Sequence, residues 1–304
     1  MNNKSKGIVL IIISAFGFAM MSTFVKLAGD LPSFQKTFFR NIVSLAIAFI
    51  LILKHKESYF GKKDSQKLLI LRSVLGTLGI IFNYYAIDRL ATLSDANILN
   101  KLSPFFAVIF SAIYLKEKID FKQMLSLIIA FIGLLFVAKP TFNFTVLPTL
   151  AGIIGGVCAG GAYTTLRVLG QKEKHYTIVF YFSLFSTIAV TPFVIATYTH
   201  MKPIQLLYLL LAGVFASVGQ FGITLAYKFA PAKEISIFDY TNIIFSAIIS
   251  ITIFGVIPDK YSVLGYCIIF LASLYTFLNE KNKVKAWLYI NTDLLIIMKN
   301  WAYN

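Results

Sequence analysis

Charged residues are scarce in this sequence of 304 residues. They make up 13% of the chain, against 58% for hydrophobic residues, and the mean hydropathy is +0.77. Soluble domains are about a quarter charged, so this chain has too few charges to surround an apolar core with a water-soluble surface. The scarcity excludes an ordinary soluble protein and predicts an all-α integral membrane protein.

Cysteine and several functional motifs are also scarce or missing. The two cysteines, Cys158 and Cys267, lie in apolar runs, which excludes a disulfide framework and a cysteine-based metal site. No GxxxxGK[ST] motif occurs, so we expect no nucleotide cofactor. The net charge of +15 comes without a nucleic-acid-binding motif. We therefore expect no metal, no cofactor and no nucleic acid as partner.

Long apolar runs recur along the chain. A membrane-spanning helix needs about 20 mostly apolar residues. The first run is longer than the apolar core of a signal peptide and no A-x-A site follows it, so we expect it to be retained. Ten spans are predicted, at 7–27, 34–53, 68–87, 92–115, 121–139, 149–170, 176–198, 204–227, 234–256 and 261–279.

Lysine is distributed unevenly between the segments that join these spans. Cytoplasmic loops are enriched in Lys and Arg, so the pattern places both termini in the cytoplasm. We expect a multi-pass protein of the cell (inner) membrane, with the lipid bilayer as its surroundings. The lysine-rich segments are the N-terminus, 54–67, 116–122, 172–174, 228–233 and the residues after 280.

The two halves of the chain match in spacing and hydropathy. A shift of 140 positions places Ala86 on Ala226 and Ala107 on Ala247, and the apolar runs fall in step. Five spans per half is an odd number, so the second half begins on the opposite side of the membrane. This predicts two inverted five-helix repeats, 7–139 and 149–279.

The segment after the last predicted span differs from the rest of the chain. Residues 280–304 contain both tryptophans, Trp287 and Trp301, together with several lysines. We expect a basic, Trp-containing cytoplasmic tail. It either lies on the membrane surface as an interfacial helix or is disordered.

The fourth span carries an unusual cluster of polar residues. A charge near the bilayer centre costs on the order of 3 kcal/mol, and Lys101 lies about 15 Å into its helix at 1.5 Å per residue. We predict that Asn97, Asn100 and Lys101 line a central polar cavity, to which Asp95 also belongs. The alternative is a structural salt bridge or interhelical hydrogen bond. Pro104 is expected to kink the helix, as a structural feature or as a gating hinge.

Two charged residues in other spans are further candidates. Arg40 can bind a substrate carboxylate or phosphate through its planar guanidinium, reach the headgroups, or pair with Asp95. Asp239 is either a proton-coupling carboxylate whose pKa is raised by desolvation or the partner of Lys101 or Lys233.

The remaining polar and small residues have simpler interpretations. Arg72, Lys26 and Arg167 lie near span ends, so we expect their side chains to extend to the headgroups. Gly156 and Gly160 predict close helix packing or a sliding surface. Six further polar residues are candidates for lining the cavity. We expect most of them to form interhelical hydrogen bonds or interfacial aromatic contacts instead. They are Asn83, Tyr84, Gln220, Tyr227, Tyr240 and Asn242.

Several local motifs accompany this architecture. They are Gly17-Phe18-Ala19 followed by Lys26, Phe38-Phe39-Arg40, and Asp95-Ala96, Ser103-Pro104-Phe105 and Leu115-Lys116-Glu117-Lys118 in the fourth span. With ten spans, inverted repeats and both termini inside, the chain resembles the EamA-type branch of the drug/metabolite transporter superfamily over residues 7–279. The resemblance implies a secondary active transporter, not an enzyme, that works by alternating access.

The charges indicate a class of substrate. Arg40, Lys101 and Arg72 outnumber the carboxylates Asp95 and Asp239, so a small zwitterionic or anionic metabolite, such as an amino acid or nucleotide-like compound, fits best. Proton coupling or exchange is expected to supply the energy, and a homodimer is possible. The alternatives are efflux of drug-like or cationic compounds and a non-transporting membrane scaffold or sensor. A lipid- or prenyl-handling enzyme is disfavoured because no paired acidic or HxxxD motif occurs.

Overall fold

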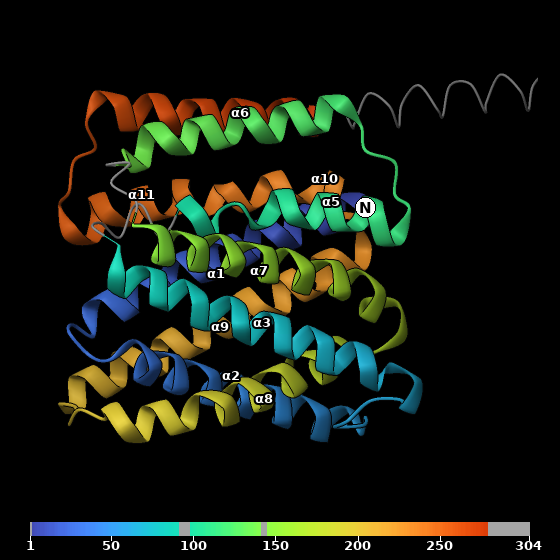
Figure 1. Ribbon diagram of the computed structural model, residues 1–304, viewed down its shortest axis with the longest axis vertical. Coiled ribbons are helices and arrows are strands. Elements are labelled where there is room, and N and C mark those ends of the chain that lie inside the picture. The colour runs from blue at the N-terminus through green and yellow to red at the C-terminus, as the bar shows by residue number, and fades with distance from the viewer. Residues whose placement is uncertain (1, 91–97, 141–144, 279–304) are drawn as a thin grey trace, which may run out of the picture.

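The structure is a computed structural model that describes residues 2–90, 98–140 and 145–278, and within these ranges every regular element is a helix (Figure 1). The elements are α1 (Asn3–Leu27), α2 (Ser33–His55), the short 3-10 helix η1 (Lys63–Ser65), α3 (Gln66–Arg89), α5 (Ser103–Leu115), α6 (Phe121–Ala138), α7 (Val146–Lys172), α8 (His175–Thr197), α9 (Pro203–Phe229), α10 (Ala232–Ile235), the 3-10 helix η2 (Ser236–Tyr240), α11 (Thr241–Phe254) and a last helix at Lys260–Leu278.

The ten predicted membrane spans are confirmed. In the described part of the chain, ten helical stretches are long and apolar enough to cross a membrane. The fifth span, predicted at 121–139, is Phe121–Ala138, and the ninth, predicted at 234–256, is Ala232–Phe254. The sequence located these spans well because a helix in hydrocarbon must satisfy all of its backbone hydrogen bonds internally and must be apolar over its whole length.

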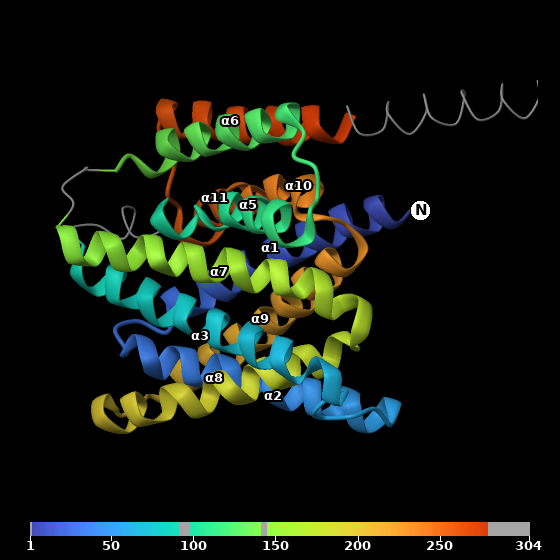
Figure 2. The same cartoon turned by 45° about the vertical axis from the view of Figure 1, so that its right-hand side comes forward.

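Helices from opposite halves of the chain lie side by side. α1 packs along α9, α3 packs along α7, and α2 packs along α8 (Figures 1 and 2). The first two pairs each join the first helix of one half to the third helix of the other, and α2 and α8 are the second helices of their halves. This exchange of partners is consistent with two inverted repeats, because a two-fold axis between the halves generates the same pairing.

Small residues allow the long helices to approach closely. A Cβ atom added at Gly17 of α1 would lie 2.7 Å from the backbone nitrogen of Gly219 in α9, and the Ser14 hydroxyl donates to the Gly219 carbonyl at 2.7 Å. A Cβ atom at Gly160 of α7 would lie 2.5 Å from the Cβ of Phe106 and 2.9 Å from the carbonyl oxygen of Ser103. The predicted role of the α7 glycines in close packing is therefore confirmed.

The fourth helix of each half is interrupted. In the first half, the helical stretch that ends at Asn100 is followed by a turn at Lys101 and Leu102 before α5 begins. In the second half, the short α10 leads into the 3-10 helix η2 and then into α11. Broken helices at membrane depth occur where the freed backbone groups are buried in protein or line a cavity.

Pro104 differs from its predicted role as a kink within a continuous helix. It occupies the first turn of α5, directly after the interruption. A proline in the first turn removes an N–H that has no partner within the helix, so it favours a new helix start rather than bending an existing helix.

α6 and the last helix form a separate layer at one side of the bundle (Figure 2). They approach each other closely at two glycines, because a Cβ atom at Gly133 would lie 2.9 Å from the carbonyl oxygen of Gly265. α6 also contacts η2, so the outer layer adjoins one of the two interrupted segments.

The N-terminus and the connections 56–62, 116–120, 173–174 and 230–231 lie at one end of the bundle, on the right in Figures 1 and 2. These are the segments in which lysine is concentrated, and we call this end the lysine-rich end. The grouping follows from the predicted alternation of the spans, since each span carries the chain to the opposite end.

Replacing Gly160 by alanine is expected to destabilise the protein by about 2 kcal/mol, because the added methyl group meets backbone atoms of α5 that cannot move independently. Gly161→Ala is the matched control, because its added Cβ would meet only the flexible end of Leu75 at 3.1 Å. Thermal unfolding of the detergent-purified variants measures the difference. Equal midpoints for the two variants would show that α5 and α7 are not held at this distance.

Candidate functional site

The two interrupted helices meet at an ion pair. Nζ of Lys101 lies 3.0 Å from Oδ2 of Asp239, and the two side chains are 21% and 12% exposed. Lys101 lies in the turn before α5 and Asp239 lies in η2, so the pair connects the fourth helix of one half to the fourth helix of the other. Of the two interpretations of Asp239, pairing with Lys101 is the one that the structure contains.

The backbone at the interruption also has a partner from the other half. The Tyr240 hydroxyl donates to the carbonyl oxygen of Lys101 at 2.8 Å, and Tyr240 is fully buried. An unpaired carbonyl would be costly away from water, so this bond allows the fourth helix to remain broken. Tyr240 and Asp239 are neighbours in η2, and together they hold both the side chain and the main chain of Lys101.

Aromatic residues continue this contact toward the lysine-rich end. The rings of Tyr163 in α7 and Tyr227 in α9 are stacked, with centroids 5.5 Å apart. The Tyr227 hydroxyl lies 3.2 Å from the Ser236 hydroxyl in η2. Asn242, at the start of α11, donates to the carbonyl oxygen of Ala15 in α1 at 2.9 Å. Tyr227 and Asn242 therefore form interhelical hydrogen bonds, as expected for most of these residues.

Arg72 contradicts the prediction that its side chain extends to the headgroups. The residue is 3% exposed, its guanidinium carbon lies 4.1 Å from the centre of the Phe182 ring, and Nη2 donates to Oε1 of Gln220 at 3.3 Å. The prediction assumed that a residue about one turn from the start of the predicted span 68–87 is near the surface. In the folded bundle α8 and α9 cover this part of α3, so the side chain points into the protein.

Arg40 is a second buried guanidinium. It lies in α2 and is 8% exposed, its Nη1 is 3.5 Å from Sδ of Met21, and its Nε is buried without a hydrogen-bond partner. The prediction that it reaches the headgroups is therefore wrong. Its predicted pairing with Asp95 cannot be assessed from the contacts, because Asp95 lies outside the described residues.

Tyr163 was not among the predicted site residues, although its ring stacks on that of Tyr227, which is one of them. Its position in the glycine-rich α7 was the available signal, because a large polar aromatic among small residues projects furthest from the helix.

The other predicted residues are distributed around this centre. Asn100 is half-buried next to the interruption, and Tyr84 is half-buried on α3. The Oδ1 atom of Asn83 is buried without a hydrogen-bond partner. Asp95 and Asn97 lie outside the described residues, as does the tail 280–304.

The lysine-rich end is closed by charged groups from several helices. Nη1 of Arg167 in α7 donates to the carbonyl oxygens of Tyr227 and Lys228 at 3.4 and 3.0 Å, and its Nε lies 3.4 Å from Oε1 of Glu117. Carbonyl groups at a helix C-terminus attract cations. Arg167 therefore binds the end of α9 instead of extending to the headgroups as predicted. Lys26 lies at the opposite end of the bundle, where its exposed side chain places Nζ 4.2 Å from the centre of the Phe254 ring.

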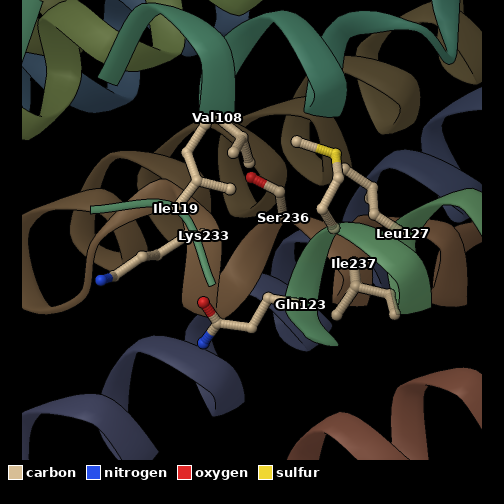
Figure 3. A pocket seen from close by; sticks show the side chains of 8 residues that line it. Val108, Ile119, Gln123, Leu127, Lys233, Ser236 and Ile237 are labelled. Carbon is tan, nitrogen blue, oxygen red and sulfur yellow. The ribbon is translucent and has the colours of Figure 1, made fainter. Parts of the chain in front are cut away.

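Further contacts at this end join other elements. Nζ of Lys233 donates to the carbonyl oxygen of Lys118 at 2.7 Å, and Lys4 pairs with Glu234 at 3.2 Å. A small crevice lies nearby, between α5, α6, α10 and η2. Figure 3 shows Lys233 pointing away from Ser236. Lys233 donates to the Lys118 carbonyl and Ser236 lies next to the Tyr227 hydroxyl, so these two lining residues are engaged outside the crevice.

Two carboxylates outside the spans have pKa values shifted in opposite directions. Partial burial raises the pKa of Glu117, and the nearby Arg167 and Lys233 offset this only in part. At the opposite end of the bundle, the hydrogen bond from Lys139, together with the backbone N–H of Ser262, lowers the pKa of Asp259 to about 2.

Comparison with known proteins gives consistent results. The profile of the family described as "EamA-like transporter family" matches residues 5–139 and again residues 147–278. A solved crystal structure resembles the fold with a TM-score of 0.80 at 13% identity, covering 91% of this chain and 98% of the other. At that identity the similarity shows the fold alone.

Curated relatives carry the names of membrane transporters. The pseudopaline exporter CntI of Pseudomonas aeruginosa (strain UCBPP-PA14) is 28% identical over 271 residues, covering 88% of this chain and 94% of the relative. Human solute carrier family 35 member G1 is 26% identical over 275 residues, covering 85% and 75%. The S-adenosylmethionine uptake transporter of Rickettsia felis is 24% identical over 278 residues, covering 90% and 92%.

Removing one member of the central ion pair is expected to destabilise the protein by roughly 2 kcal/mol. This is less than the roughly 3–5 kcal/mol typical of fully buried pairs, because both side chains are partly exposed. Lys101→Met and Asp239→Asn should each lower the thermal midpoint, and the reversed pair Lys101→Asp/Asp239→Lys should recover part of the loss. Lys139→Met is the control, since its pair with Asp259 is about half exposed and such pairs contribute little. Additive effects of the two single substitutions would contradict the pairing.

The opposite pKa shifts predict opposite pH dependence. A raised pKa in the folded state means that stability falls as the pH rises above 4.5, the ordinary value for glutamate, so Glu117→Gln should be at least as stable as the wild type at neutral pH. A lowered pKa stabilises above 3.8 and the effect is lost toward about 2. Asp259→Asn should therefore be slightly less stable at neutral pH, since its pair with Lys139 is about half exposed, and the difference should shrink on acidification. Thermal unfolding between about pH 3 and 7.5 tests both signs. A less stable Glu117→Gln at neutral pH would contradict the burial argument.

Proposed function

The chain belongs to the EamA-like transporter family, and we propose that it is a secondary active transporter that moves a small polar metabolite by alternating access. The observation that carries the proposal is the Lys101–Asp239 ion pair at the point where the fourth helices of both halves are interrupted. Transporters with inverted repeats place their substrate and coupling sites at discontinuous helices near the membrane midplane.

Two groups of helices are the proposed moving parts. The first contains α3, the fourth span and α7, which pack together, and the second contains α1, α9 and the ninth span. Each group takes helices from both predicted repeats, 7–139 and 149–279. Rocking of one group against the other around a fixed central site is the movement that inverted repeats support.

The contacts between these groups support a state that is closed at the lysine-rich end. Arg167 and Gln171 of the first group donate to the Lys228 carbonyl of the second, and Lys233 of the second donates to the Lys118 carbonyl of the first. The central pair Lys101–Asp239 joins the groups at mid-depth. We propose that substrate leaves or enters at the opposite end in this state and that these bonds break when the bundle reverses.

Lysine-rich loops favour the cytoplasmic side, so we propose that the closed end faces the cytoplasm and that both termini lie there, in the cell (inner) membrane. The relatives include both an exporter and an uptake transporter. Similarity to them therefore favours neither import nor export.

The charges at the centre favour a zwitterionic or anionic substrate. Arg40 and Arg72 are cationic, while the charge of Lys101 is balanced by Asp239. Asp239 is also the group we propose for proton coupling, because its protonation would release Lys101; exchange of one substrate for another is the alternative. Efflux of cationic compounds would require an excess of negative charge here, which the described residues do not provide. A non-transporting scaffold or sensor would not require the broken helices.

The proposal is tested by proton and solute movement in proteoliposomes that carry the full-length protein and a pH-sensitive dye. Amino acids, nucleotides, S-adenosylmethionine and quaternary amines are added in turn under an imposed proton gradient. We expect one class of polar metabolite to move, with flux at least about tenfold lower in Lys101→Met, because an intramembrane charge at the repeat interface acts on transport directly. Lys139→Met, at the outer layer, is the control with the same change of charge.

Two other results of this experiment would contradict transport of a polar metabolite. Flux of quaternary amines alone would replace it with cation efflux. Equal signals from protein-containing and empty liposomes across the panel would favour a scaffold or sensor.

A further inference from the structure

Two guanidinium groups are buried in the membrane-embedded bundle without a carboxylate in the described structure. Arg72 and Arg40 are 3% and 8% exposed. Among the described residues, the carboxylates that form ion pairs bind other cations: Asp239 binds Lys101, Glu117 binds Arg167, and the remaining pairs lie at the ends of the bundle. An ionisable residue within a membrane bundle is expected to have a partner or a function.

The contacts of Arg72 are weak for so deeply buried a charge. Its Nη2 makes one hydrogen bond of 3.3 Å, to the neutral amide oxygen of Gln220, whereas charge-assisted bonds to an anionic oxygen are about 2.7–2.9 Å long. Its Nε and Nη1 are buried without a hydrogen-bond partner. The face of the Phe182 ring stabilises the cation, but it does not accept these hydrogen bonds. Nε carries one N–H and Nη1 carries two, so these three of the five guanidinium donors have no acceptor.

The position of Arg72 makes it accessible when the bundle reverses. Arg72 belongs to α3 in the first helix group, and its hydrogen-bond partner Gln220 belongs to α9 in the second. Separation of the groups removes the Gln220 oxygen and leaves the guanidinium without an acceptor.

We propose that Arg72 binds an oxyanion group of the substrate, a carboxylate or a phosphate, and that Gln220 occupies the same donors as a neutral substitute when the site is closed. This inference rests on the proposed transport function and names the chemical group that the site recognises. The planar guanidinium suits both oxyanions because each presents two oxygens to it.

Gly76 is a positioning residue for this group. A Cβ atom at Gly76 would lie 2.2 Å from Nη1 of Arg72 and 2.7 Å from the Phe182 ring. Only a residue without a side chain allows the guanidinium to lie between the α3 backbone and that ring. Gly76→Ala should therefore displace the Arg72 side chain while it keeps the charge.

The test measures the thermal midpoint of the full-length, detergent-purified protein against matched probes. Succinate is compared with succinamide, and glycerol 3-phosphate is compared with glycerol. Because a ligand that binds only the folded state raises the midpoint, we expect a rise with at least one oxyanion probe and none with its uncharged partner. A response to succinate alone identifies a carboxylate, and a response to glycerol 3-phosphate alone identifies a phosphate.

Variants then assign the response to Arg72. Arg72→Gln and Gly76→Ala should each weaken binding of the active probe on the order of 30-fold, as expected when a buried charge pair is lost. Arg89→Gln, an exposed arginine at the end of the same helix, is the control that should bind like the wild type. Unchanged probe binding in Arg72→Gln would overturn the proposal, as would the absence of a response to both oxyanion probes in the wild type.

The variant Gln220→Glu distinguishes an Arg72 that binds the probe from an Arg72 that only stabilises the fold. It also provides a test if Arg72→Gln fails to fold. The added carboxylate should pair with Arg72, raise the midpoint of the unliganded protein and abolish the response to the probe. A purely structural Arg72 predicts the higher midpoint with the probe response retained, which would overturn the proposal. Gln220→Met, of similar size but uncharged, should not occupy the guanidinium and should retain the response.

Failure of the proposed Arg72 site can be distinguished from failure of the proposed transport function. Lys101-dependent flux of a quaternary amine, without any oxyanion response, would overturn the Arg72 site and leave transport intact. Binding of an oxyanion probe that depends on Arg72, without flux of any compound, would support the site and overturn the transport function.

Discussion

The absence of water within the bilayer is the constraint on which the rest of this structure depends. Each charge and each freed backbone group at membrane depth needs a partner inside the protein. The break in the fourth helix exposes the carbonyl oxygen of Lys101, and Tyr240 from the other half donates to it. The Lys101 ammonium has Asp239 as its partner. The two broken helices therefore stabilise each other, and neither would be tolerated alone.

Close packing of small residues makes this arrangement possible. Gly17 allows α1 to approach the α9 backbone, and Gly156 and Gly160 allow α7 to approach the fourth span. These contacts bind helices within each proposed moving group. The hydrogen bonds of Arg167, Gln171 and Lys233 and the Lys101–Asp239 ion pair join one group to the other. Polar contacts of this kind can break and reform, which suits a transporter that alternates between two states.

Electrostatics differ between the two levels of the bundle. The lysine-rich end is closed by cations that bind carbonyl oxygens and carboxylates, as Arg167 does with the end of α9 and with Glu117. Within the bundle, Lys101 and Asp239 balance each other, whereas the buried Arg72 has only a neutral hydrogen-bond acceptor. Charge at the closed end is thus satisfied by the protein itself, and the charge of Arg72 is the one that we propose a ligand satisfies.

The sequence by itself determined the ten spans and the membrane class, because apolar length is a property of local composition. It also identified Lys101, Asp239 and Tyr240 as candidates, without deciding their partners. Only the tertiary structure decided that Arg72 and Arg167 point into the protein, that Tyr163 stacks on Tyr227, and that Pro104 lies in the first turn of a helix. Distance from a span end predicts depth in the membrane, but it does not predict which neighbouring helix covers a side chain. That choice depends on contacts such as Arg72 with Phe182 and Gln220, which come from helices more than a hundred residues away.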